Sequence, residues 1–384
     1  MSLRRRFYGP LLNRLLRQFP IVCILGPRQC GKTTFVKHHL PQWHYFDLEK
    51  PSHHVQMESD PEAVLGRFQK QMVLDEAQQL PDLFPVLRGF VDEQRKINGR
   101  IVLLGSASPH LIRNISESLA GRVGFLDMSP FHILEAPKEK ELWLKGGFPD
   151  AFLARYQEKR MQWYEGYTRT FIERDLQMYG IDVNPSQMRK LMSMLAHLHG
   201  GIFNASELGN ALGMNYHTVQ RYVEILEQTF LVRRLRPYFA NIGKRLVKSP
   251  KIYLRDSGLL HYFLNIHGED NLLVHPKRGF SWEGFVVEQI MNAFALFNPG
   301  TECYFWQVNS QEDVDLLIKG PKTITPVEIK LHTAPSKNDV QGLFRCMKYL
   351  NLKKGYVIHP KGESYSLGDG VQVVSLQNFL EDFI

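Results

Sequence analysis

Residues 26–34 combine glycines and polar side chains in a spacing that can hold the phosphates of a nucleotide. They fit the pattern G-x-x-x-x-G-K-[ST] and read Gly26-Pro27-Arg28-Gln29-Cys30-Gly31-Lys32-Thr33-Thr34. Gly26 and Gly31 permit backbone angles that let consecutive N–H groups converge on one anion. Lys32 would reach the β- and γ-phosphates, and the Thr33 hydroxyl would complete a Mg²⁺ shell. The spacing therefore predicts a site for ATP and Mg²⁺.

The residues on either side of this loop predict the strand and the helix that such a site requires. An apolar run at 21–25 precedes the loop, and a helical segment at 35–40 follows it. A helix that begins near Lys32 would add unpaired N–H donors and the positive end of its dipole. This context favours a nucleotide site over an ordinary glycine-rich loop.

Two carboxylates end a later apolar run. A strand is predicted at 44–48, and a second one, at 71–76, ends in Asp75 and Glu76. Asp75 would hold Mg²⁺ through water, and Glu76 would polarise the water that attacks the γ-phosphate. Taken alone, the pair could cap the helix that follows. Beside a phosphate loop, we interpret it as the acidic half of a hydrolytic site.

Two further residues could contact the terminal phosphate. The apolar run at 100–105 predicts a strand that ends at Ser106, which could bind the attacking water or the γ-phosphate, or could be a simple turn residue. Arg122 precedes a strand predicted at 123–127. It could reach a γ-phosphate held by a neighbouring subunit, which would require a homo-oligomer, or it could be a surface arginine.

A charged, aromatic helix is predicted at 163–175. It could form a lid over the nucleotide, with Arg169 or Arg174 touching phosphate. The spacing of Tyr167, Phe171 and Asp175 favours packing and salt bridges instead.

Residues 188–235 have the pattern of a winged helix-turn-helix. Predicted helices flank a turn at 213–215, and a strand expected from 230 onwards would form the wing. If this module reads DNA, the exposed residues would be Asn215, Tyr216, His217, Gln220 and Arg221, with Arg233 and Arg234 following on the wing. Winged helices also dock proteins, so both interpretations stay open.

The segment between Glu227 and Asp256 contains eight basic residues and no acidic one. They are Arg233, Arg234, Arg236, Lys244, Arg245, Lys248, Lys251 and Arg255. Their number equals the net charge of the whole chain, +8. Such a run could be a solvated face, but next to a winged helix it also suggests contact with the phosphates of DNA.

A second set of acids lies in the C-terminal part. Two predicted strands would bring Asp315 opposite Glu328 and Lys330, and a helix upstream supplies Glu283, with Glu288 as a second choice. Two carboxylates and a lysine suit metal-assisted cleavage of phosphodiesters. The acids, Asp315 and Glu328 foremost, would place Mg²⁺, and the lysine would steady the nucleophile or the phosphate. A scaffold without activity is the alternative.

The chain resembles prokaryotic AAA-family ATPases that carry a winged helix and a C-terminal PD-(D/E)XK nuclease-like domain of unassigned function. The matching stretches are 26–34, 75–76, 118–122, 146–149, 244–256 and 326–330. The resemblance implies an α/β protein. It would contain a P-loop AAA-type parallel-sheet ATPase domain at 1–130, a helical lid or linker at 131–187, a winged helix at 188–250 and an α/β nuclease-like domain at 251–384.

Composition agrees with this organisation. A chain of 384 residues with 43% hydrophobic content can build two or three domains with real cores. The four cysteines form no C-x-x-C pair, and no apolar run is long enough for a membrane span, so we expect a reduced, cytoplasmic protein. We predict Mg²⁺-dependent ATP hydrolysis coupled to DNA. The alternative is a nucleotide-gated switch that binds protein and carries an inactive nuclease-like domain.

Overall fold

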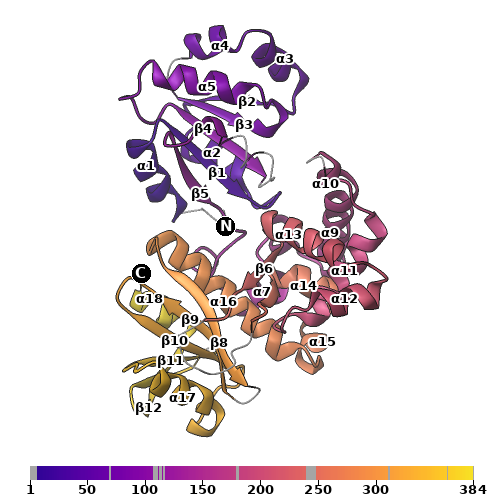
Figure 1. Cartoon of the computed structure of the whole chain (residues 1–384), viewed down its shortest axis with the longest axis vertical. Coiled ribbons are helices and arrows are strands. Elements are labelled where there is room, and N and C mark those ends of the chain that lie inside the picture. Colours follow the sequence, from indigo (N-terminus) through magenta and orange to yellow (C-terminus); the bar gives the residue numbers. More distant parts are fainter. Residues whose placement is uncertain are drawn as a thin grey trace. The chain divides into compact units, whose positions relative to one another are not determined.

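The computed structural model describes residues 7–68, 71–106, 111, 115, 117–178, 181–238, 248–309, 312–360 and 362–383 (Figure 1). It divides into two compact units. The first holds residues up to 131 with 175–181 and 228–230, and the second holds 132–174, 182–227 and 231–384. None of the helices in the described ranges is both long and apolar enough to cross a membrane.

The first unit is built on a five-stranded sheet whose neighbouring strands all run parallel, in the order β2-β3-β4-β1-β5. The strands are β1 Ile21–Gly26, β2 His44–Asp47, β3 Met72–Asp75, β4 Ile101–Ser106 and β5 Val123–Asp127. β1 and β3 are buried along their whole length, as expected for a parallel sheet covered on both faces. The strands lie where the apolar runs predicted them, which confirms a parallel α/β domain.

Helices surround this sheet (Figure 1). They include α1 Tyr8–Gln18, α2 Lys32–His39, α3 Pro51–Ser59, α4 Pro61–Arg67 and α5 Leu83–Asp92. One core joins alternate side chains of β1, β3 and β4 to α3, α4 and α5. Because β4 lies between β1 and β3, the segments that leave these three strands converge at one edge of the sheet.

The second unit begins with a helical region. Its helices include α7 Glu139–Lys145, α8 Pro149–Phe152, α9 Gln157–Thr170, α14 Ser257–Phe263 and α15 Glu269–Val274. A π-helical turn, η2 Phe171–Asp175, and α10 Leu176–Met178 follow α9 along the chain, and from Asp175 these residues belong to the first unit. Tyr167 and Phe171 are buried, which confirms the packing role predicted for them.

Asp256 ties this helical region together. Its carboxylate accepts hydrogen bonds from the Gly147 N–H at 2.7 Å, the Tyr164 hydroxyl at 2.8 Å and the Leu259 N–H at 2.8 Å, where it caps α14. Gly146 has a φ of 78°, and a Cβ there would lie 2.3 Å from the Tyr164 hydroxyl oxygen. The glycine turn predicted at 146–149 and Asp256 thus hold three segments of one core.

Asp256→Asn is expected to lower the free energy of unfolding of the second unit by about 2 kcal/mol, because an amide donor replaces an oxygen that accepts buried hydrogen bonds. Urea unfolding followed by circular dichroism measures the shift in midpoint. Asp270→Asn, at an exposed position in the first turn of α15, is the matched control. An Asp256→Asn midpoint equal to that of the control would contradict the role given to Asp256.

Three helices and a small sheet come next in the second unit. They are α11 Pro185–Leu198, α12 Ala205–Leu212, α13 Tyr216–Gln228 and the antiparallel strands β6 Val232–Leu235 and β7 Lys251–Leu254. Ile202 forms a further bridge to Lys251. Gly213, with a φ of 64°, ends α12, and Asn215 caps α13 by accepting from the Thr218 N–H at 2.8 Å. The domain boundary predicted at 250/251 cuts this sheet and is wrong, because β7 pairs with β6.

The C-terminal part combines the long helix α16 Arg278–Phe297 with a six-stranded mixed sheet in the order β12-β13-β11-β10-β9-β8. The strands are β8 Glu302–Asn309, β9 Glu312–Lys319, β10 Ile324–Ile329, β11 Gly355–His359, β12 Tyr365–Gly368 and β13 Val371–Ser375. β8, β9 and β10 pair antiparallel, whereas β11 runs parallel to both β10 and β13. α17 Gln341–Tyr349 lies between β10 and β11 in the chain, and α18 Leu376–Phe383 follows β13.

Candidate functional site

The phosphate loop joins β1 to α2 at the carboxyl edge of the parallel sheet, as predicted. Gly31 has a φ of 98° and forms the N-cap of α2. A Cβ on Gly26 would lie 2.2 Å from the carbonyl oxygen of Met128, so only glycine fits there. The Cys30 thiol also donates to that carbonyl, at 3.5 Å. The loop is therefore held against the segment that leaves β5.

Lys32 is buried and lies inside the loop. Its Nζ donates to the carbonyl oxygens of Gly26 and Pro27, at 3.0 Å each. These neutral acceptors hold the ammonium group beside the loop amides. A phosphate would offer the same group stronger, anionic acceptors.

Thr33 and Asp75 are in direct contact. The Thr33 hydroxyl donates to Asp75 Oδ2 at 2.7 Å, and the Glu76 N–H donates to Asp75 Oδ1 at 3.0 Å. The Tyr45 hydroxyl, on β2, donates to the same carboxylate. A hydroxyl beside a carboxylate at the start of a phosphate loop fits Mg²⁺, which takes oxygen ligands from one or two protein groups, phosphates and water.

Glu76 follows β3 directly and has a φ of 54°. The side-chain amide of Gln78 donates to its carboxylate. Burial raises the pKa of Glu76 above its ordinary value, and the nearby charge of Lys32 works in the opposite direction. A partly buried carboxylate with a raised pKa, beside the phosphate loop, is suited to accept a proton from water.

The two residues predicted to contact the terminal phosphate differ in position. Ser106 ends β4 opposite Gly26 in the parallel register, at the loop edge, but its side chain lies outside the described residues. Arg122 precedes β5, and its carbonyl accepts from the Ile21 N–H at the opposite edge of the sheet. Its guanidinium binds both oxygens of Asp92, at 2.8 and 2.6 Å. Arg122 therefore lies away from the phosphate loop of its own sheet, and contact with a neighbouring subunit's phosphate stays a prediction.

Arg28 of the loop forms an ion pair with Asp175, a buried residue of the same unit. The predicted salt bridge of Asp175 is thus made with the phosphate loop itself, a partner that helical spacing did not indicate. Arg169, by contrast, is exposed and pairs with Glu173 at 3.0 Å, as packing along a helix predicts.

Five of the predicted DNA contacts lie at the start of α13. Asn215, Tyr216, His217 and Arg221 are exposed and Gln220 is partly so. The Gln220 amide donates to the Tyr216 hydroxyl at 3.0 Å. The Arg221 guanidinium donates to the carbonyl of Asp182 at 3.1 Å. These positions are compatible with an exposed recognition face.

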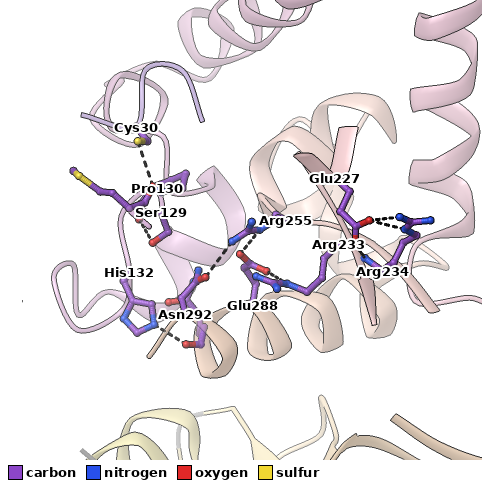
Figure 2. A network of polar contacts seen from close by, with 12 residues as sticks. Cys30, Ser129, Pro130, His132, Glu227, Arg233, Arg234, Arg255, Glu288 and Asn292 are labelled. Atoms are coloured by element: carbon purple, nitrogen blue, oxygen red, sulfur yellow. Dashed lines mark hydrogen bonds and ion pairs between the residues drawn. The ribbon is translucent and has the colours of Figure 1, made fainter. Parts of the chain in front are cut away.

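Arg233 and Arg234 do not extend that face. Arg233 donates to Glu288 at 2.6 Å, and Arg255 donates to the other oxygen of the same carboxylate at 2.7 Å (Figure 2). Arg234 forms an ion pair with Glu227, which Figure 2 also shows. Glu288 is buried, and despite burial the two arginines hold its pKa below the ordinary value. The DNA contact predicted for Arg233 is therefore corrected to an internal ion pair.

Asp315 and Glu328, the acidic residues predicted on neighbouring strands of the C-terminal part, do lie close together. Asp315 on β9 accepts from the Ile329 N–H of β10 at 2.9 Å. Next to it, Glu328 accepts from Lys330 at 2.7 Å. Burial raises the pKa of Glu328 well above its ordinary value, and the Asp315 charge adds to this effect. Of the two helical acids, Glu283 joins the cluster and Glu288 does not.

Lys251 is the unexpected member of this cluster. Its Nζ lies 3.2 Å from Glu283 Oε1 and 3.4 Å from Asp315 Oδ1. The Tyr253 hydroxyl donates to the same Glu283 oxygen at 2.6 Å. Burial raises the pKa of Glu283 to about 7, against the opposing effect of Lys251. The contacts that Tyr45, Asp175 and Lys251 make with the two sites were not predicted from the sequence. Each of these residues lies on a different element from the residue that it contacts.

Comparison with known protein families supports the interpretation of the first unit as a nucleotide-binding domain. The AAA domain family matches residues 18–136, and with the parallel sheet and the loop it defines a P-loop ATPase of the AAA class. Residues 137–270 and 278–379 match two domains of unknown function, DUF8612 and DUF4143.

Full-length relatives define the family. The uncharacterized proteins Rv2008c of Mycobacterium tuberculosis and Mb2031c of Mycobacterium bovis are each 38% identical to this chain, over 99% of it and 85% of their own length. The chain belongs to the family of these proteins. Among solved structures, the Walker-type ATPase PABY2304 of Pyrococcus abyssi matches with a TM-score of 0.49 and 14% identity, over 68% of this chain and 98% of that one.

Proposed function

We propose that this chain binds and hydrolyses ATP with Mg²⁺ and couples that reaction to DNA. The observation that carries the proposal is the arrangement at one sheet edge of Lys32, the Thr33–Asp75 contact and Glu76. Lys32 would exchange two carbonyl oxygens for phosphate oxygens, and the loop amides would bind the same anion. Bound Mg²⁺ would neutralise charge that develops on the phosphates.

Side chains of the protein would hold the ion and activate the attacking water. Thr33 and Asp75 would hold the ion, with Tyr45 orienting the Asp75 carboxylate through its hydrogen bond. Glu76 would take the proton of the attacking water. Ser106, at the end of the adjacent strand, is retained as the candidate for the water or the γ-phosphate.

Release of phosphate from ATP by the purified chain, with Mg²⁺ and then with EDTA, tests this proposal. We expect turnover only with Mg²⁺. If the protein binds neither ATP nor GTP in the presence of Mg²⁺, the proposed activity is wrong.

The proposed link to DNA is supported by the order of three helices and two antiparallel strands, with the exposed start of α13 where a recognition helix would contact DNA. Phosphate contacts make such binding strongly dependent on salt. The C-terminal α/β domain would add a second surface for DNA.

Arg221→Ala is expected to weaken binding of duplex DNA and to reduce the slope of log K against log salt concentration by about 1, because one phosphate contact is lost. Fluorescence anisotropy between low and physiological salt measures the slope. Lys190→Ala, which removes a positive charge from an exposed position on α11, is the control. DNA binding that is absent or insensitive to salt would contradict the coupling to DNA.

One observation favours the alternative, a nucleotide-gated switch that binds protein. Of the basic segment that suggested DNA, Arg233, Arg234, Lys251 and Arg255 are engaged by acids of the chain itself. Lys244 and Arg245 lie outside the described residues. Arg236 and Lys248 are exposed, so the described segment offers DNA fewer charges than its composition indicates.

A further inference from the structure

The cluster of acidic residues in the C-terminal domain, formed by Glu283, Asp315 and Glu328, already contains a cation. Lys251 reaches it from β7, a strand that pairs with β6 and bridges to Ile202, and is therefore fixed by another part of the second unit. Only 6% of the residue is exposed. Its Nζ lies between one oxygen of Glu283 and one of Asp315, and 5.7 Å from the centre of the Phe305 ring.

The ligand oxygens of the cluster are largely occupied by these protein groups. Asp315 uses one oxygen for Lys251 and the other for the Ile329 N–H. Glu328 Oε1 accepts from Lys330. Glu328 Oε2 is buried and has no hydrogen-bond partner among the residues that the structure describes. The half-buried Asp313 lies at the margin of the cluster.

This arrangement does not provide the ligand geometry that a divalent ion requires. Mg²⁺ requires nearly octahedral oxygen ligands at about 2.0–2.1 Å. An ammonium group between two of the acids would repel it and occupy their lone pairs. Within the described ranges, no three His, Cys, Asp or Glu side chains are arranged to hold a metal.

We infer that Lys251 is the resident cation of the Glu283–Asp315–Glu328 cluster, and that it excludes divalent metal and therefore metal-assisted phosphodiester cleavage from this domain. The domain would then serve as a binding module. This inference extends the proposed function of the C-terminal domain, and it holds whether or not the first unit hydrolyses ATP.

Binding of Mn²⁺ to the full-length chain without nucleotide tests the inference, with titration calorimetry and electron paramagnetic resonance as readouts. Wild-type protein and Asp315→Asn should bind Mn²⁺ equally weakly. Lys251→Met, which keeps the volume and frees two carboxylate oxygens, should bind Mn²⁺ about tenfold more tightly or better, and Mn²⁺ should raise its melting temperature. Lys251→Arg, which keeps the charge, should show no gain.

Adding Asp315→Asn to Lys251→Met should abolish the gain, which locates the ion in the cluster. The Thr33–Asp75 site is present in every variant, so its contribution cancels, and ATP turnover reports separately on that site. A folded Lys251→Met variant without tighter Mn²⁺ binding would overturn the inference. So would a wild-type Mn²⁺ site that Asp315→Asn removes, a comparison that decides the matter even if Lys251→Met does not fold.

Discussion

Lys32→Ala is expected to weaken ATP binding by about 100-fold or more. The Lys32 ammonium already lies within the loop, bound to two carbonyl oxygens at 3.0 Å. On binding, it would exchange them for charged phosphate oxygens, and hydrogen bonds to charged groups contribute about 1.5–3 kcal/mol each. Two such bonds correspond to about two to four powers of ten in affinity.

Titration with a fluorescent ATP analogue in the presence of Mg²⁺ measures this loss. Lys96→Ala, which removes an exposed lysine from the same unit, is the matched control and should bind as wild type does. Circular dichroism must show that Lys32→Ala is folded, because the substitution leaves two loop carbonyls without their donor. Wild-type affinity in the folded variant would exclude this loop as the nucleotide site.

Glu76→Gln is expected to slow ATP turnover by about 100- to 1,000-fold while ATP binding changes little, because a positioned general base contributes factors of this size. Glutamine keeps the shape of the side chain but cannot accept the proton. In wild type, kcat should fall as the pH drops through the pKa of Glu76, which burial places above 4.5. In Glu76→Gln, kcat should not show this fall at low pH.

Glu93→Gln, at an exposed position after α5, is the control for Glu76→Gln and should retain wild-type turnover. Single-turnover measurements with bound ATP separate the chemical step from binding. If Glu76→Gln hydrolyses ATP at the wild-type rate, another group activates the water.

The sequence predicted the first unit well because its signals are local. A phosphate loop compresses strand, turn and helix start into a few residues, so Lys32 and Thr33 had to lie near the end of β1. Asp75 and Glu76 follow from the same geometry, since parallel strands deliver their carboxyl ends to one edge. Arg122, by contrast, precedes its strand and so lies at the other edge of its own sheet, and its contact with a neighbouring subunit's phosphate stays a prediction.

Predictions that depended on distant partners fared less well. The basic segment was interpreted as a surface for DNA because it contains no acid of its own. Two of its acidic partners, Glu283 and Glu288, lie on α16, and Glu288 is separated from Arg233 by 55 positions. Tyr45 and Asp175 likewise carry no local signal of their contacts. Pairings of this kind become visible only when separate elements are placed in space.

The shared carboxylate of Glu288 has a consequence for the history of this chain. Arg233 lies on β6, Arg255 directly follows β7, and α16 supplies the acid, so each segment carries charges that only the other neutralises. A gene fragment encoding only the part after Arg255 would lack Arg233, Lys251 and Arg255, and would leave the buried Glu283 and Glu288 without these counter-charges, which is strongly unfavourable. We therefore expect the segment that carries Arg233 and Arg255 and the segment that carries Glu288 to be retained together.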